Sequence, residues 1–167
     1  MDGAAPGRLA VFGGLHLLGA TEAARDNQIG EASRLLDTAA RVAVRTGETN
    51  HFRMVFGPTN VAIHRVSTAA ELGRTADALR LAERVPVQRA PAVERHLTFH
   101  LDAARCYLRQ RNDVAAVHML QRIHTESPEE LRYSSLTRET LRQLKARAQP
   151  AIESDLLPLL AVAGLPD

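Results

Sequence analysis

The chain has no tryptophan, and its few tyrosine and phenylalanine residues give an aromatic fraction of only 4%. Apolar residues nevertheless make up 45% of the 167 residues, so alanine and leucine must fill most of the core. These small or unbranched side chains favour closely packed helices, whereas β-sheets prefer β-branched and aromatic residues. The composition therefore predicts an all-α chain with the length of one ordinary domain.

Cysteine is nearly absent as well, because Cys106 is the only one. A single cysteine excludes a disulfide within the chain and fits a reducing compartment. The N-terminal residues lack the basic segment and long apolar core of a secretory signal. The apolar run at residues 156–163 is too short to span a membrane and predicts a final helix that docks on the core. We therefore expect a cytoplasmic protein without a membrane partner.

Positive charge is also sparse. The formal net charge is +2 with neutral histidine, Lys145 is the only lysine, and no basic run alternates with aromatic residues. Nucleic-acid surfaces carry concentrated basic patches, so direct nucleic-acid binding by this chain is not expected. Six arginines are expected on solvated outer faces, namely Arg34, Arg41, Arg45, Arg80, Arg84 and Arg89.

Signatures of catalysis are missing too. The sequence contains no glycine-rich phosphate loop and no serine in a strained elbow. Cys106 adjoins Tyr107 in a predicted buried helix, where a thiol is usually unreactive. His96 and His100 have the i, i+4 spacing of metal ligands, but no neighbouring glutamate completes a protease-type site. We therefore predict no enzyme, no metal site and no cofactor.

Glycine and proline divide the chain into segments with apolar residues at helical spacing. Pro58, for example, follows Gly57 and is suited to the first turn of a helix. No segment shows the alternation of a strand. The predicted helices cover about residues 7–26, 29–45, 58–72, 75–85, 92–110, 113–124, 136–148 and 152–162, with a further short segment that begins near residue 129.

Small residues recur at intervals close to those of tetratricopeptide repeats. Ala32, Ala78 and Ala116 lie 46 and 38 residues apart, against roughly 34 in that repeat. The third unit fits best, since Ala104, Tyr107, Leu120, Ile123 and Pro128 occupy its small, aromatic, bulky, small and proline positions, although Ile123 is larger than usual there.

This spacing predicts a tetratricopeptide-like stack of antiparallel helical hairpins in a single domain, residues 1–167. About three repeats, at about residues 7–45, 58–85 and 92–124, are expected, with C-terminal capping helices at about 129–163. A generic helical bundle is the alternative.

Residues 56–67, with the sequence FGPTNVAIHRVS, together with residues 71–73 and 78–85, resemble a segment of known regulators. These are the actinobacterial helix-turn-helix regulators of the xenobiotic-response-element class. The resemblance continues through residues 94–95, 100–105, 115–117, 127–130 and 141–142, within about residues 15–164. It implies a tetratricopeptide-like C-terminal region that senses a ligand and forms a dimer. The family's DNA-binding head is absent from this chain, which is therefore not expected to bind DNA alone.

Stacked hairpins leave a concave face lined by the first helix of each pair. Asn60, His64 and Ser67 lie at i, i+4 and i+7, so an amide, an imidazole and a hydroxyl share one helix stripe. An asparagine amide both donates and accepts hydrogen bonds, and Arg105 with Arg109 could hold a carboxylate. The ligand-binding residues expected on this face are Thr21, Arg25, Asn60, His64, Ser67, Thr98, Asp102, Arg105 and Arg109.

Several functions are compatible with this groove. The main hypothesis is a ligand-sensing and dimerisation domain of a bacterial transcriptional regulator, homodimeric, which binds a small metabolite or peptide. A stand-alone adaptor for protein or peptide partners is the alternative, and a structural assembly module is a third. In a purely structural interpretation, Asn60 satisfies backbone groups at the start of its helix and His64 packs between hairpins.

Overall fold

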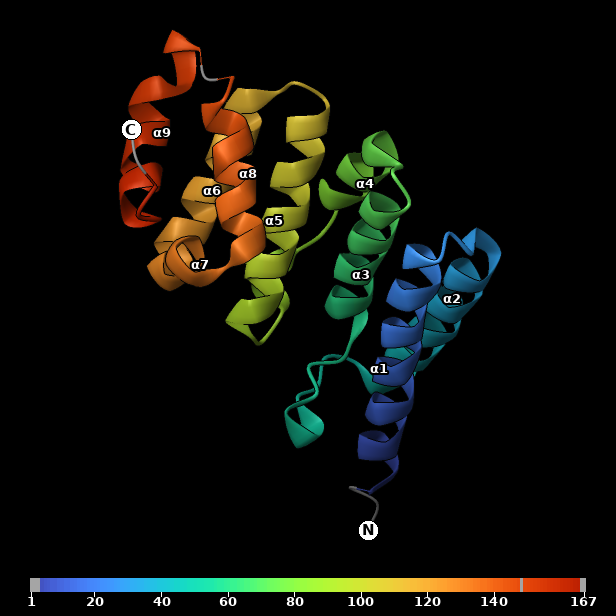
Figure 1. The fold of residues 1–167 in the computed structure, drawn as a ribbon. Coiled ribbons are helices and arrows are strands. Elements are labelled where there is room, and N and C mark those ends of the chain that lie inside the picture. The colour runs from blue at the N-terminus through green and yellow to red at the C-terminus, as the bar shows by residue number, and fades with distance from the viewer. Residues whose placement is uncertain (1–3, 148, 166–167) are drawn as a thin grey trace. The chain divides into compact units, whose positions relative to one another are not determined.

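The computed structural model describes residues 4–147 and 149–165, and their side chains from residue 7 onward. Within these residues the regular secondary structure is helical, apart from one antiparallel β-bridge between Thr49 and Phe56. Figure 1 shows α1 (Ala4–Arg25), α2 (Ile29–Thr46), α3 (Pro58–Glu71), α4 (Thr75–Ala82), α5 (Val93–Arg109), α6 (Asp113–Glu126), α7 (Pro128–Tyr133), α8 (Ser135–Lys145) and α9 (Pro150–Val162). Two short 3-10 helices, η1 (His51–Arg53) and η2 (Val87–Arg89), lie in the connections.

The predicted all-α class is confirmed, and most helix bounds agree with the expected ones within a few residues. Three differences stand out. The segment before Pro58, expected to be a plain linker, contains η1 and the β-bridge. Helix α4 ends at Ala82 and not near residue 85. Helix α8 ends at Lys145, and the predicted end at residue 148 lies outside the described residues.

The chain divides into two compact units, one ending at Arg95 and the other beginning at His96. Each unit has an apolar cluster of its own. The single domain expected for residues 1–167 stays a prediction, and residues 1–3, 148 and 166–167 of it are not described. None of the described helices has the length and apolar character needed to cross a membrane.

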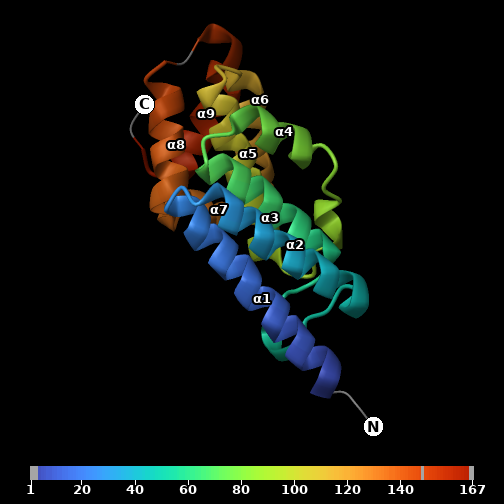
Figure 2. The same ribbon diagram turned by 90° about the vertical axis from the view of Figure 1, so that its right-hand side faces the viewer.

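In the first unit, α1 and α2 pair as an antiparallel hairpin, and α3 packs against both of them (Figure 2). Apolar residues of α2 recur every three or four positions and face α1, as an amphipathic helix requires. The shared cluster consists of Ala10, Leu17, Ala20, Leu36, Ala39, Val42, Ala43, Phe56 and Val61. This packing fixes α3 beside α1.

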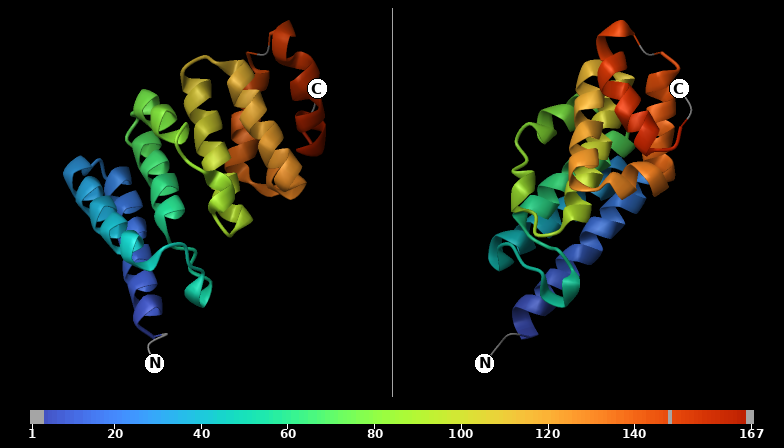
Figure 3. Two further views of the ribbon diagram at one scale, coloured as in Figure 1. Left: turned by 180° about the vertical axis from the view of Figure 1, so that it is seen from behind. Right: turned by 90° about the vertical axis from the view of Figure 1, so that its left-hand side faces the viewer.

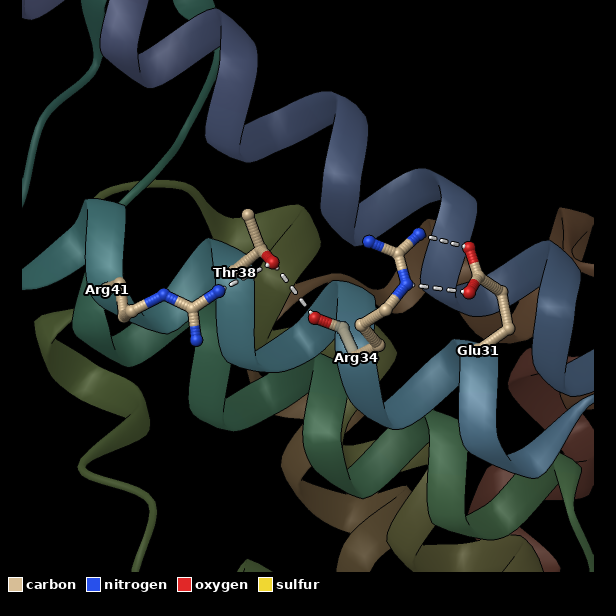
Figure 4. Close-up of polar contacts among 4 residues, drawn as sticks. All are labelled: Glu31, Arg34, Thr38 and Arg41. Atoms are coloured by element: carbon tan, nitrogen blue, oxygen red, sulfur yellow. Dashed lines mark hydrogen bonds and ion pairs between the residues drawn. The ribbon is translucent and has the colours of Figure 1, made fainter.

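The outer face of α2 is polar (Figure 4). The Arg34 guanidinium donates two hydrogen bonds to the Glu31 carboxylate, at 2.8 and 2.6 Å. Arg41 donates to the Thr38 hydroxyl at 3.0 Å, and that hydroxyl donates to the Arg34 carbonyl. All six arginines expected on outer faces are exposed, which confirms that expectation.

In the second unit, α9 lies beside α6 and also contacts α7 and α8 (Figure 3). Leu156, Leu159 and Leu160 are at most 2% exposed and join the apolar cluster of this unit. The last helix therefore docks on its own core, as the apolar run predicted.

The small residues Ala32, Ala78 and Ala116 are all fully buried, with no exposed surface. Each lies near the start of the second helix of a pair, where a larger side chain would separate the helices. Their burial agrees with the spacing that suggested the repeat. The stacking of the hairpins as tetratricopeptide-like units stays a prediction.

Candidate functional site

The connection between α2 and α3 runs beside α1 (Figure 3), and its side chains pack against glycines of that helix. A β-carbon at Gly13 would overlap the ring of Phe56, which is fully buried. A β-carbon at Gly14 would lie 2.6 Å from the Met54 methyl group, far inside van der Waals contact. Gly13 and Gly14, which are unfavourable residues inside a helix, therefore form the surface on which the connection packs.

The start of α3 is fixed by a second close approach. A β-carbon at Gly57 would lie only 2.7 Å from the Glu48 α-carbon, so the two backbones touch at a glycine. The Glu48 carboxylate accepts a hydrogen bond from the Thr59 amide at 2.7 Å and satisfies one of the free donors at the start of the helix. Pro58 needs no such acceptor. This junction sets where the side chains of Asn60 and His64 lie.

A cavity of about 480 Å³ lies in the first unit, between α1, the α2–α3 connection, α3 and the first residues of α5. Its volume is within the range of small-molecule sites. The wall combines apolar side chains with a few polar and charged groups. The lining residues are Gly14, Leu17, Leu18, Asn50, Arg53, Met54, Val55, Asn60, His64, Ala92, Glu94 and Arg95.

Asn60 is the buried polar residue of this wall, at 5% exposure. Its Nδ2 donates to the Val55 carbonyl at 2.7 Å, which fixes the amide orientation because a carbonyl only accepts. Its Oδ1 is out of contact with solvent and accepts no hydrogen bond from any described residue. A buried acceptor left without a donor costs about 1–3 kcal/mol. The unpaired acceptor of Asn60 therefore lowers the stability of the folded chain.

His64 lies one turn further along α3 and is held by α1. Its Nδ1 is 3.4 Å from the Thr21 Oγ1, and the Thr21 hydroxyl donates its proton to the Leu17 carbonyl at 3.1 Å. With the Thr21 hydroxyl turned to the Leu17 carbonyl, the tautomer that completes this contact carries its proton on His64 Nδ1 and has Nε2 as an acceptor. Burial, with a smaller contribution from the Arg95 charge, lowers the pKa of His64 to about 4. The ring is therefore neutral near pH 7.

The charged residues of the wall are Arg53, Glu94 and Arg95. In the described part of the chain, neither arginine forms a salt bridge with a carboxylate. Arg53 and the preceding Phe52 have positive φ angles of 59° and 56°, which are unfavourable for side chains of this size. The docked connection holds Arg53 in this conformation at the cavity wall.

The structure brings together three of the predicted site residues, Thr21, Asn60 and His64. Thr21, Arg25 and Ser67 do not line the cavity. Arg25 is exposed and paired with Glu22 at 2.6 Å, and Ser67 lies further along α3. The ligand-binding roles of these three residues stay predictions.

The remaining predicted residues, Thr98, Asp102, Arg105 and Arg109, lie on α5 in the second unit. Asp102 and Arg105 form an ion pair at 3.8 Å. All four residues have a bonding or electrostatic interaction, so none of them is free. A continuous groove that joins them to Asn60 and His64 stays a prediction.

His96 and His100 share a carboxylate partner in the second unit. Glu126 lies 2.8 Å from His96 Nδ1 and 3.5 Å from His100 Nε2. No group of three or more potential ligands among the described residues could hold a metal ion. Burial raises the pKa of the Cys106 thiol to about 11, so the thiol is protonated and unreactive near pH 7.

The residues that the connection and α5 contribute to the wall were not predicted from the sequence, above all Arg53, Met54, Val55 and Arg95. Met54 and Phe56, two residues apart, fit a short extended segment with one side toward the core. Phe52, the next residue of this alternation, is 74% exposed and lies in η1, so the signal was weak. The glycines of α1 are the matching partners, but no local pattern links the two segments.

Comparison with protein-family models, with curated proteins and with solved structures gives no match to this chain. Function is therefore inferred from the geometry of the cavity. The resemblance seen in residues 56–67 contributes an expectation about the biological setting.

Proposed function

We propose that the first unit is a ligand-sensing module that binds a small metabolite in the cavity beside Asn60 and His64. The carrying observation is that Asn60, a residue of the cavity wall, has a buried Oδ1 with no hydrogen-bond donor among the described residues. Buried polar groups in folded proteins nearly always have a partner. A ligand that donates a hydrogen bond to Asn60 Oδ1 would remove the cost of this unpaired acceptor and so stabilise the folded chain.

The wall has the composition of a specific small-molecule site. Apolar surface from Leu17, Leu18 and Met54 surrounds a small number of polar groups. Such a combination gives affinity through burial and specificity through a few directed bonds. The volume of about 480 Å³ suits a metabolite better than an extended peptide.

The elements that surround the cavity support a sensing role in addition to binding. A ligand there would contact α1, α3 and the connection that holds Arg53 in an unfavourable backbone conformation. Since a ligand shifts a conformational equilibrium only by its differential affinity, contacts to a strained connection are a means of shifting it. The resemblance to helix-turn-helix regulators supports a homodimeric regulator as the setting, with DNA binding by a separate head.

A protein-binding adaptor is the second candidate, and one observation favours it. Phe12, Leu15 and Leu18 form an exposed stripe on α1, at 48%, 58% and 57% exposure. Large exposed apolar side chains grouped on one helix face are typical of protein contacts. The same stripe could also form the contact between two copies of this chain. The adaptor hypothesis therefore requires that a different protein binds to it.

The test is the thermal stability of the purified chain in a protein-free small-molecule extract of cells. Binding to the folded state raises Tm, and the gain grows with ligand concentration. We expect a rise for the wild type and none for Asn60→Leu, which removes the acceptor at similar volume. An equal rise in both proteins would contradict the proposed site.

A further inference from the structure

We propose that the ligand of this cavity is a small organic acid. Its carboxylate pairs with Arg95 and Arg53, a neighbouring N–H or O–H group donates to Asn60 Oδ1, and its apolar body packs on Leu17 and Met54. This inference rests on the proposed function and names the chemistry of its ligand.

The charged residues of the cavity wall favour a negatively charged ligand. Two arginines and one glutamate line the cavity, and Glu94 already has a contact of its own. Arg95 is half-buried and close enough to His64 for its charge to disfavour the protonated imidazole. The same charge disfavours any cationic ligand and favours a carboxylate, which an arginine can bind through two parallel hydrogen bonds.

The uncharged polar groups of the cavity wall favour a ligand that donates hydrogen bonds. Asn60 Oδ1 accepts no bond from a described residue, and the tautomer of His64 leaves Nε2 as an acceptor. One of the two Asn60 Nδ2 hydrogens is already used by the Val55 carbonyl. The unpartnered buried atom of Asn60 is its acceptor Oδ1, and a ligand complements it with an N–H or O–H group.

Ligand entry requires the wall to yield locally, because Asn60 Oδ1 has no contact with solvent. Met54 provides this adaptability. Its side chain lines the cavity and its methyl group rests against Gly14, and methionine has three rotatable bonds and repacks easily. The polar bond and the apolar contact thus form together, which favours a molecule that carries both features over a simple anion.

Three matched probes separate the contributions. N-acetyl-L-leucine carries a carboxylate, an N–H group and an apolar body. Its amide lacks the charge, and isocaproate lacks the N–H group. Titration of the full ¹⁵N-labelled chain, followed by NMR, gives each affinity and reports directly on the Asn60 side-chain amide.

The acid is expected to bind about tenfold more tightly than either comparison probe, because the amide loses the charge-assisted hydrogen bonds to arginine and isocaproate leaves the Asn60 acceptor unpaired. Arg95→Gln should remove the preference for the acid over the amide, and Arg95→Lys should restore part of it. Arg89→Gln removes an exposed charge outside the cavity and should change nothing.

Equal affinities of the acid and the amide would overturn the inference, and so would the absence of binding by all three probes. The proposed function is judged separately. A neutral or cationic molecule recovered from the chain, and lost with Asn60→Leu, would support the cavity as a ligand site while rejecting an organic acid as its ligand.

Discussion

The ring of Phe56 rests on the α-carbon of Gly13, in a space that a β-carbon would fill. This contact joins the connection before α3 to the middle of α1. Both elements contribute residues to the cavity wall. The site therefore depends on a glycine in a helix, where glycine is otherwise unfavourable.

Gly13→Ala should destabilise the chain by about 1–3 kcal/mol, because the added methyl group displaces a buried aromatic ring. Gly30→Ala is the matched control. A β-carbon at Gly30 would have no neighbouring atom within 4 Å, so the better helix propensity of alanine should stabilise the chain by roughly 0.5–1 kcal/mol. Urea denaturation measures both changes. Equal effects of the two substitutions would show that the Gly13–Phe56 contact does not matter.

Glu48→Ala should cost about 1 kcal/mol, the usual effect of removing a helix cap, because the Thr59 amide loses its acceptor. Glu48→Gln keeps an oxygen in place and should recover part of this loss. Thermal unfolding tests the expected order of stability, in which the wild type is the most stable, Glu48→Gln is intermediate and Glu48→Ala is the least stable. If Gln were as destabilising as Ala, the carboxylate charge at the helix start, and not the hydrogen bond, would be the important interaction.

His64 should make stability pH-dependent. Its pKa is about 4 in the folded chain and near 6.5 when unfolded, so the unfolded state binds the proton first as pH falls. Its contribution is complete above pH 6.5 and is lost between about pH 6.5 and 4, by as much as about 3 kcal/mol. The measured quantity is the unfolding free energy against pH for the wild type and for His64→Gln. Parallel curves would contradict a buried neutral His64.

Asn60→Asp should destabilise the chain more than Asn60→Leu. Aspartate loses the donor to the Val55 carbonyl and places a negative charge in a buried position, at a cost of about 2–4 kcal/mol. Leucine removes the hydrogen bond and the unsatisfied oxygen together. Chemical denaturation compares the two variants, and a more stable Asp variant would mean that the Asn60 side chain is not buried as described.

The helices were predictable because their signals are local. Pro58 marks the start of α3, and the burial of Ala32, Ala78 and Ala116 follows from the spacing of small residues. The same spacing placed Asn60 and His64 on one stripe of α3. These inferences need only the helical period and the conformational preferences of proline.

The cavity was only partly predictable because its wall comes from four separate segments. The positive φ angles of Phe52 and Arg53 have no sequence signature, since neither residue type favours that conformation. Arg95 approaches His64 through tertiary packing that no local pattern reports. The expected partners on α5 were chosen by repeat register, which cannot show whether a side chain is already engaged by a neighbour, as Arg105 is by Asp102.

The most direct test of the central claim is native mass spectrometry of the purified chain and of Asn60→Leu, prepared in parallel. We predict a small-molecule adduct on the wild type that is absent from the variant, while Arg89→Gln retains it. An adduct of the same mass and occupancy on Asn60→Leu would contradict ligand binding at the cavity beside Asn60 and His64.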